Sequence, residues 1–144
     1  DWLAVKAVVN SVQIPVFVNG DIISCETAKT ALKASQAAGV MVGRAAMGQP
    51  WLLAQIADHI SGLPVRLVPD MLQRNLMMIK HLNDIRVEKG EIGLRSARKH
   101  FASYCDHLEE SDELRAVAMR TSSASELKDA ISEYFLESSR LTAA

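Results

Sequence analysis

The sequence is poor in the residues that mark metal-binding, secreted and membrane proteins. It has two cysteines among 144 residues, Cys25 and Cys105, which lie far apart and outside any C-x-x-C pattern. This spacing favours neither a zinc site nor a disulfide framework, and it fits a reducing cytosol. No apolar stretch approaches the roughly 20 residues that a membrane span requires, and the chain does not begin like a signal peptide. We therefore expect a soluble, cytoplasmic protein without a bound metal.

An excess of charge is also missing. The net charge of −1 gives no general attraction to polyanions, so contacts to nucleic acid would have to come from a local cluster of Lys and Arg. The 49% of hydrophobic and 23% of charged residues are ordinary for a globular protein of one domain or two small units. The chain starts at Asp1 inside a helix-like pattern and without methionine, which suggests a piece of a longer protein.

The first part of the chain has the pattern of a helix followed by a strand-helix-strand unit. Residues 1–10 have helical apolar spacing, and residues 14–18 form an apolar run that predicts a strand buried on both faces. Ser24 is a candidate N-cap for the next helix, Gly39 is a candidate end, and residues 40–42 resemble a second strand. A strand, a helix and a strand in such close succession predict a parallel βαβ unit.

The rest of the chain has only helical patterns. Pro50 suits the first turn of a helix, Asp70 begins another, and Gly90 and Gly93 bound the linker to a third. A shorter helix is expected around Leu114–Arg120 and a final one from Ser125. The inward residues expected in the second and third helices, both clearly amphipathic, are Leu72, Leu76, Ile79 and Leu82, and then Leu94, Ala97, Phe101, Tyr104 and Leu108. A composition shift near residues 61–69 separates an α/β piece, 1–61, from an all-α piece, 62–144.

Two glycine turns are the first candidate site. Asn19-Gly20-Asp21 and Gly43-Arg44 each follow a predicted strand directly. In a barrel of alternating strands and helices, the turns after neighbouring strands lie side by side, and the last two commonly hold a phosphate. Glycine lets backbone N–H groups approach an anion, and Arg44 could add a bidentate contact. The spacing of these residues alone is equally typical of ordinary turns that bind no ligand.

Several segments together resemble one enzyme family. IPVFVNGDI at 14–22 and VMVGRAAMGQPW at 40–51 are similar to the last two strand-turn motifs of tRNA-dihydrouridine synthases, in particular the bacterial B-type branch. The segment from Glu91 to His100 resembles the Arg-x-Ala-Arg-Lys-His region of that branch's C-terminal helical domain, and Ala130 to Phe135 is also similar. Gln49 departs from the pattern, because the family often has arginine before Pro-Trp.

The resemblance implies an α/β TIM-barrel fragment, containing the final βαβ unit, followed by an all-α helical bundle that binds tRNA. It implies an FMN enzyme that reduces uridine in tRNA to 5,6-dihydrouridine with NADPH. On this basis the FMN contacts, mainly at its phosphate end, are Asn19, Gly20, Asp21, Gly43 and Arg44. The family's catalytic cysteine lies in an Asn-x-Gly-Cys-Pro motif that this chain lacks. We therefore expect no catalytic residue here and an inactive chain when it is alone.

The two cysteines are weak candidates for chemistry. Cys25 would lie near a helix N-terminus, which stabilises a thiolate, but it has neither the family motif around it nor a nearby histidine as base. An ordinary helix-start residue is the preferred interpretation, and Cys105 is expected in the core. Metal-ligand spacing is absent around His59, His81, His100 and His107, and packing is the preferred role for Trp51 and the methionines.

A group of basic residues is the second candidate site. Arg95, Arg98 and Lys99 fall within one sector of a helix, opposite its apolar stripe. Arg86 and Lys89 lie just upstream, so the stretch could contact several phosphates of tRNA. A solvated basic face is the alternative interpretation.

Two rival functions share part of this pattern. Another FMN barrel oxidoreductase would have the glycine turns, and a non-enzymatic RNA-binding or regulatory module would have the basic helix. Two parallel strands without further neighbours leave open edges and an apolar face, so we expect residues 14–42 to be unstable alone. An ordered structure would then require self-association with another copy, a swapped element or a rearranged helix packing.

Overall fold

The computed structural model describes residues 1–90 and 92–142, so Glu91 of the family-like segment lies outside the described residues. The chain divides into two compact units, Asp1–Val68 and Pro69–Ala144. This division lies within the region of changing composition but later than the expected boundary after residue 61. The reason is local: Arg66 binds the side chain of Asp58, which keeps the connecting segment on the first unit.

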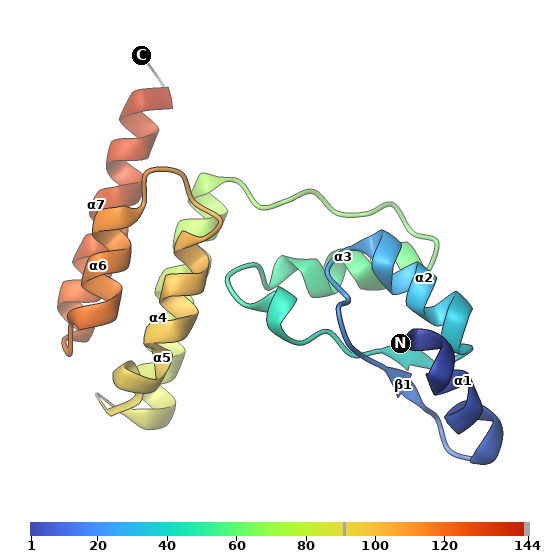
Figure 1. The fold of residues 1–144 in the computed structure, drawn as a ribbon. Coiled ribbons are helices and arrows are strands. Elements are labelled where there is room, and N and C mark those ends of the chain that lie inside the picture. Colours follow the sequence, from blue (N-terminus) through green and yellow to red (C-terminus); the bar gives the residue numbers. More distant parts are fainter. Residues whose placement is uncertain (91, 143–144) are drawn as a thin grey trace. The chain divides into compact units, whose positions relative to one another are not determined.

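Unit 1 combines helices with a small parallel sheet (Figure 1). Its elements are α1 (Trp2–Ser11), β1 (Phe17–Val18), α2 (Cys25–Ser35), β2 (Gly39–Val40), the 3-10 helix η1 (Arg44–Ala46) and α3 (Trp51–Ile60). The two strands are parallel, with Phe17 opposite Gly39 and Val18 opposite Val40. The predicted βαβ unit is therefore confirmed.

The strands are shorter and less buried than the sequence suggests. Among the described residues, β1 and β2 pair only with each other. Val18 is fully buried, whereas Phe17 is 62% exposed and Ile14 also faces solvent. Burial on both faces is therefore wrong for this unit, because its helices cover one face of the sheet and successive side chains point to opposite faces.

Helix α2 begins where expected and ends before Gly39, its expected end. Ser24 forms a capping box with Thr27 at its start. At the other end, Gln36 takes the left-handed conformation with φ of 56°, and its N–H donates to the carbonyl of Leu32 at 2.8 Å. Gly39 lies in β2 and not at the helix end. A Cβ at Gly39 would come within 2.6 Å of the Phe17 ring, so the glycine permits a close approach.

One apolar cluster holds unit 1 together. Its buried members come from β1, the turn after it, α2 and α3. They are Val18, Ile22, Ala28, Ala31, Leu52 and Ile56. Trp2 and Val5 of α1 pack against the margin of this cluster, which places α1 next to the first glycine turn. The cluster therefore fixes the elements that carry both turns.

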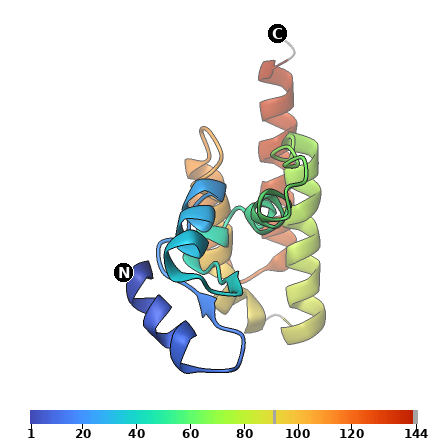
Figure 2. The same ribbon diagram turned by 90° about the vertical axis from the view of Figure 1, so that its right-hand side faces the viewer.

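Among its described residues, unit 2 contains helices joined by turns and no strand. Its elements are α4 (Met71–Lys89), α5 (Ile92–Cys105), α6 (Asp112–Arg120) and α7 (Ala124–Thr142). Helix α4 packs on α5 and α7, and α6 packs on the same two helices, which closes a four-helix bundle. Figure 2 shows α4 and α7 side by side. The expected all-α character is confirmed.

The core of unit 2 corrects the expected inward face of α4. Leu72 and Leu76 are 66% and 61% exposed, whereas Met78 and Leu82 are buried. Because α4 packs between α5 and α7, its inward face runs through Met71, Met78 and Leu82, with Ile79 packed beside it. The expectation is therefore confirmed for Ile79 and Leu82 and wrong for Leu72 and Leu76. The buried residues of the bundle are Met78, Leu82, Leu94, Ala97, Phe101, Tyr104, Cys105, Leu114, Ala118, Ala124, Leu127, Ile131 and Phe135.

The turn between α4 and α5 also differs from expectation. Gly90 ends α4 with φ of 60°, but Gly93 lies inside α5 and is buried. A Cβ at Gly93 would come within 2.6 Å of Cβ of Lys89 and 2.9 Å of Cγ2 of Ile85. Gly93 therefore lets α5 start directly against the end of α4.

Candidate functional site

The two glycine turns meet at one open pocket of unit 1. Its volume is about 360 Å³. The five residues singled out as FMN contacts, Asn19, Gly20, Asp21, Gly43 and Arg44, all line it, together with Ile22, Ile23, Met41 and Ala45. Parallel pairing of β1 and β2 produces this arrangement, because it brings the carboxyl ends of both strands to one edge. Its lining combines the backbone of two glycine turns with the apolar residues Ile22, Ile23 and Met41.

The first turn is held in an unusual conformation. Gly20 has φ of 95° and Asp21 has φ of 52°, both in the left-handed region. The indole Nε1 of Trp2 donates a hydrogen bond of 2.7 Å to the carbonyl oxygen of Gly20. Helix α1 therefore anchors the turn from outside the pocket, a contact that the sequence pattern does not indicate.

The two turns are linked by an ion pair. Nη2 of Arg44 lies 4.0 Å from Oδ1 of Asp21, and these side chains are 94% and 89% exposed. Such an exposed pair contributes little to stability, so the guanidinium can reorient at small cost. An anion entering the pocket would compete with the Asp21 carboxylate for Arg44.

Gln49 contacts a residue of the pocket wall without adding charge. Its Nε2 donates to the carbonyl of Ala45 at 3.0 Å, which supports the segment that carries Arg44. An arginine at this position would place a second cation near the pocket. Positive charge at the pocket therefore depends mainly on Arg44.

Neither cysteine has the environment of an activated nucleophile. Burial raises the pKa of the Cys25 thiol, and the neighbouring Glu26 raises it further. Burial also raises the pKa of Cys105, which packs inside the bundle core. Both thiols are therefore held in the protonated form, which is a poor nucleophile.

The basic residues of α5 do not behave alike. Arg95 and Lys99 are exposed, whereas Arg98 is half-buried. Nη2 of Arg98 donates to the carbonyl oxygens of Arg120 at 3.2 Å and Thr121 at 3.0 Å. The expectation of three cations facing away from the bundle is therefore wrong for Arg98. Its long side chain reaches across to α6 and binds carbonyls at the C-terminus of that helix.

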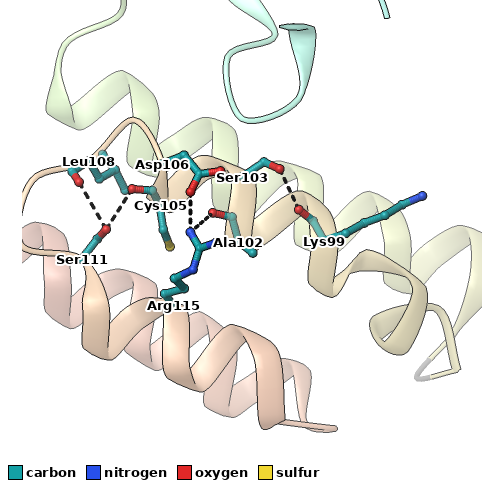
Figure 3. Close-up of polar contacts among 8 residues, drawn as sticks. All are labelled: Lys99, Ala102, Ser103, Cys105, Asp106, Leu108, Ser111 and Arg115. Atoms are coloured by element: carbon teal, nitrogen blue, oxygen red, sulfur yellow. Dashed lines mark hydrogen bonds and ion pairs between the residues drawn. The ribbon is translucent and has the colours of Figure 1, made fainter. Parts of the chain in front are cut away.

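The far end of α5 has its own polar contacts (Figure 3). Nη1 of Arg115 donates to the carbonyl of Ala102 at 3.0 Å and to Asp106, and Ser111 donates to the carbonyl of Cys105 at 3.0 Å. The Lys99 side chain points away from these contacts in Figure 3, while its carbonyl accepts from Ser103. Lys99 is thus available to a ligand.

Within residues 1–90 and 92–142, no three His, Cys, Asp or Glu side chains gather as metal ligands would. In the same part of the chain, no helix combines the length and apolarity needed to cross a bilayer.

Comparison with known proteins gives a consistent result. The family model for dihydrouridine synthase (Dus) matches residues 1–140. A probable tRNA-dihydrouridine synthase of Rickettsia conorii is 35% identical over 136 residues, which cover 94% of this chain and 41% of the relative. A Rhodobacter capsulatus protein of the same description is 42% identical over 121 residues, covering 83% of this chain and 37% of the relative. The tRNA-dihydrouridine synthase B of Pseudomonas syringae pv. tomato is 34% identical over 123 residues, which cover 83% of this chain and 36% of the relative. The chain thus spans about two fifths of the length of these relatives.

Proposed function

Because the chain belongs to the dihydrouridine synthase family, we propose that it is part of an enzyme that reduces uridine to 5,6-dihydrouridine in tRNA. The match runs through both units, and the relatives' names specify tRNA as the substrate. We assign the chain to the C-terminal part of a B-type enzyme acting in the cytoplasm. The name of the Pseudomonas relative supports the B-type assignment. Because the chain spans only about two fifths of the length of these relatives, we expect it to be inactive alone.

We propose that the unit 1 pocket holds the phosphate end of FMN. The space above Gly20 and Gly43 is open, with no atom within 4 Å of a Cβ built on either residue, so a phosphate could approach both backbones. Arg44 supplies a cation that can make two N–H contacts to the anion. FMN, when bound, supplies hydride transfer from NADPH to the uridine ring. The residues of this chain bind and orient the cofactor, with Trp2 fixing the first turn.

We further propose that unit 1 is the last βαβ unit of a TIM barrel. The parallel strands, the pocket at their carboxyl ends and the exposed apolar side chains of Phe17 and Ile14 support this assignment. Further strands of the barrel would cover that exposed face. When this chain is alone, self-association would cover the same face with a second copy of the chain.

Unit 2 is proposed to bind tRNA. The supporting observation is that Arg95 and Lys99 are exposed residues of α5, so both can contact phosphates. Arg98 contributes mainly by holding α5 to α6, and any contact it makes to RNA would have to come from its remaining N–H groups.

A chimeric enzyme tests the proposed function. This chain would replace the matching region of the Rhodobacter capsulatus relative, with dihydrouridine in tRNA and bound flavin as the two measurements. We expect activity in the chimera, and loss of flavin with Arg44→Ala. Lys29→Ala, which removes another exposed cation of unit 1, should change neither. A folded chimera that makes no dihydrouridine would contradict the proposal, and full flavin retention in the Arg44 variant would contradict the phosphate site.

A further inference from the structure

Four rings gather where α4 packs on α5. The ring centroid of His81, from α4, lies 5.7, 5.7 and 5.9 Å from the centroids of three rings of α5, which are His100, Phe101 and Tyr104. Phe101 and Tyr104 are only 1% and 6% exposed and belong to the bundle core. His81 therefore joins α4 to the aromatic part of this core, and His100 lies beside it.

The hydroxyl of Tyr104 makes a hydrogen bond that depends on the charge of His81. The hydroxyl oxygen lies 3.2 Å from Nδ1 of His81. In a neutral imidazole, Nδ1 can accept the hydroxyl proton, whereas in an imidazolium both ring nitrogens are donors. Protonation of His81 therefore turns the acceptor into a donor. The buried Tyr104 must then accept this bond, and its own proton needs another acceptor.

The contact between the two histidines opposes double protonation. Their ring centroids are 5.7 Å apart, with the ring planes tilted by 53°. Both rings belong to a residue type with an ordinary pKa near 6.5, so they titrate in the same pH range. Two positive charges at this separation repel, which makes the second proton harder to add than the first. The packed arrangement thus favours a neutral pair.

The charges on α4 do not compensate for this repulsion at His81. Burial of the ring lowers the pKa of His81 most, and the neighbouring His100 lowers it further. Asp84 acts in the opposite direction, but Nζ of Lys80 binds both of its carboxylate oxygens, at 3.0 and 2.7 Å. The charge of Lys80 also lowers the pKa of His81. Asp84 is therefore a weak partner for a protonated His81.

The charges that act on His100 are likewise positive. Burial lowers the pKa of His100, and Lys99 of α5 and Lys89 of α4 lower it further. Among the described residues, the charges that act on either ring come from α4 and α5, although α7 also packs on α4.

We propose that His81 and His100 form a pH-sensitive contact between α4 and α5, which packs while both rings are neutral and loosens as the rings take up protons in mildly acidic solution. The loosening would admit water to Phe101 and Tyr104, which pack on the His81 ring. This inference concerns the bundle itself and does not depend on the proposed function of unit 2.

The direction of the pH effect follows from proton binding. Because the pKa values of both rings are lowered on folding, the folded chain binds fewer protons than the unfolded chain in this range. The stability of the bundle is therefore fully present above the ordinary histidine pKa of about 6.5 and decreases as the pH falls below it.

The first test is an NMR titration of the histidine rings in the whole chain between about pH 8 and pH 5. His100→Gln removes one of the two charges, so the ring pKa of His81 should rise by about 0.5–1. Tyr104→Phe removes the hydroxyl that favours the neutral ring, and should also raise it. The control His107→Gln changes an exposed histidine outside these ring contacts and should leave the ring pKa of His81 unchanged.

The second test is amide hydrogen exchange of residues 100–104, corrected for the intrinsic exchange rates. We expect these amides to open roughly three to ten times more often at about pH 5.5 than at about pH 7.5. In His100→Gln this pH dependence should be smaller, and in His107→Gln it should equal that of wild type.

The same ring pKa of His81 in wild type and His100→Gln would overturn the coupling of the two histidines. If His100→Gln fails to fold, the wild-type titration decides. Coupled rings give curves broader than a one-proton transition, so a simple one-proton curve for both rings would overturn the proposal. Opening of residues 100–104 that does not change between the two pH values would overturn the proposed loosening.

Discussion

Trp2 and Gly20 are joined by a hydrogen bond of 2.7 Å from the indole Nε1 to the carbonyl oxygen. The bond links residues 18 positions apart in the chain and fixes the backbone of the first turn while leaving its pocket side open. A residue outside the pocket therefore determines the position of the backbone that the ligand would contact.

Trp2→Phe should loosen this turn. The substitution keeps an aromatic ring but removes the donor, which lowers the free energy of unfolding by about 0.5–1.5 kcal/mol. Hydrogen exchange of the amides in residues 19–21 should become faster. Val8→Ala, an exposed change on the same helix, is the matched control and should leave that exchange unaltered. Equal exchange in Trp2→Phe and wild type would show that the hydrogen bond does not hold the turn.

Asp58 should make unit 1 sensitive to acid. Hydrogen bonds from Arg66, including Nε at 2.7 Å and Nη2 at 2.8 Å, lower the pKa of Asp58 from 3.8 to about 2. Because the pKa is lowered on folding, the stabilisation is present above about pH 4 and is lost as the pH falls towards 2. In wild type, the unfolding midpoint should fall as the pH is lowered from about 4 to about 2, and Asp58→Asn should make this fall smaller. The control variant Asp129→Asn should show the same fall as wild type. A fall as large in Asp58→Asn as in wild type would refute the role of Asp58.

Arg98 should contribute to stability more than its two basic neighbours. Arg98→Ala removes charge-assisted contacts to the C-terminus of α6, which we expect to cost about 1–2 kcal/mol after allowance for partial exposure. Arg95→Ala should stay within about 0.5 kcal/mol of wild type, because its side chain is exposed. Denaturant unfolding measures both. Equal stabilities would mean that the α6 contacts contribute nothing measurable.

Gly93→Ala should destabilise the bundle although alanine favours helix. The helical gain is about 1 kcal/mol. Against it, the new Cβ would lie 2.6 Å from Cβ of Lys89, an atom close to the backbone that moves only if α4 moves. Overpacking of this kind costs about 1–3 kcal/mol, so we expect a net loss. Ser96→Ala on the same helix is the control, and a more stable Gly93→Ala protein would exclude the tight contact.

The features that the sequence predicted correctly depend on local chemistry. Ser24 caps α2 through residues within one turn, Asn19 follows β1 directly, and Gly43 follows β2 after two further residues. Once both strands are predicted as parallel neighbours, their turns must lie at the same edge. The common location of Asn19 and Arg44 therefore follows from the predicted parallel pairing.

The features that the sequence did not predict depend on the tertiary packing of one element against another. Leu72 and Leu76 have good helical spacing, but the inward face of α4 is set by its contacts with α5 and α7. Arg98 lies in the predicted basic sector, yet α6 lies within reach of that side chain. Likewise, no pattern indicates that Trp2 reaches Gly20 or that His81 meets His100. Such contacts follow from tertiary packing and not from the spacing of residues along one helix.

The most direct measurement of the proposed tRNA contact is a salt series of tRNA titrations with the whole chain, monitored by anisotropy. The Arg95→Ala/Lys99→Ala variant removes two exposed cations and should fold normally, with thermal melts as the check. If both contact phosphates, affinity should fall for many tRNA sequences alike, and the slope of log affinity against log salt should decrease by about 1–2 units. The matched variant Lys29→Ala/Lys33→Ala, which removes two exposed cations from α2, should keep the wild-type slope. Equal affinities and equal slopes in all three proteins would contradict tRNA binding by this face of α5.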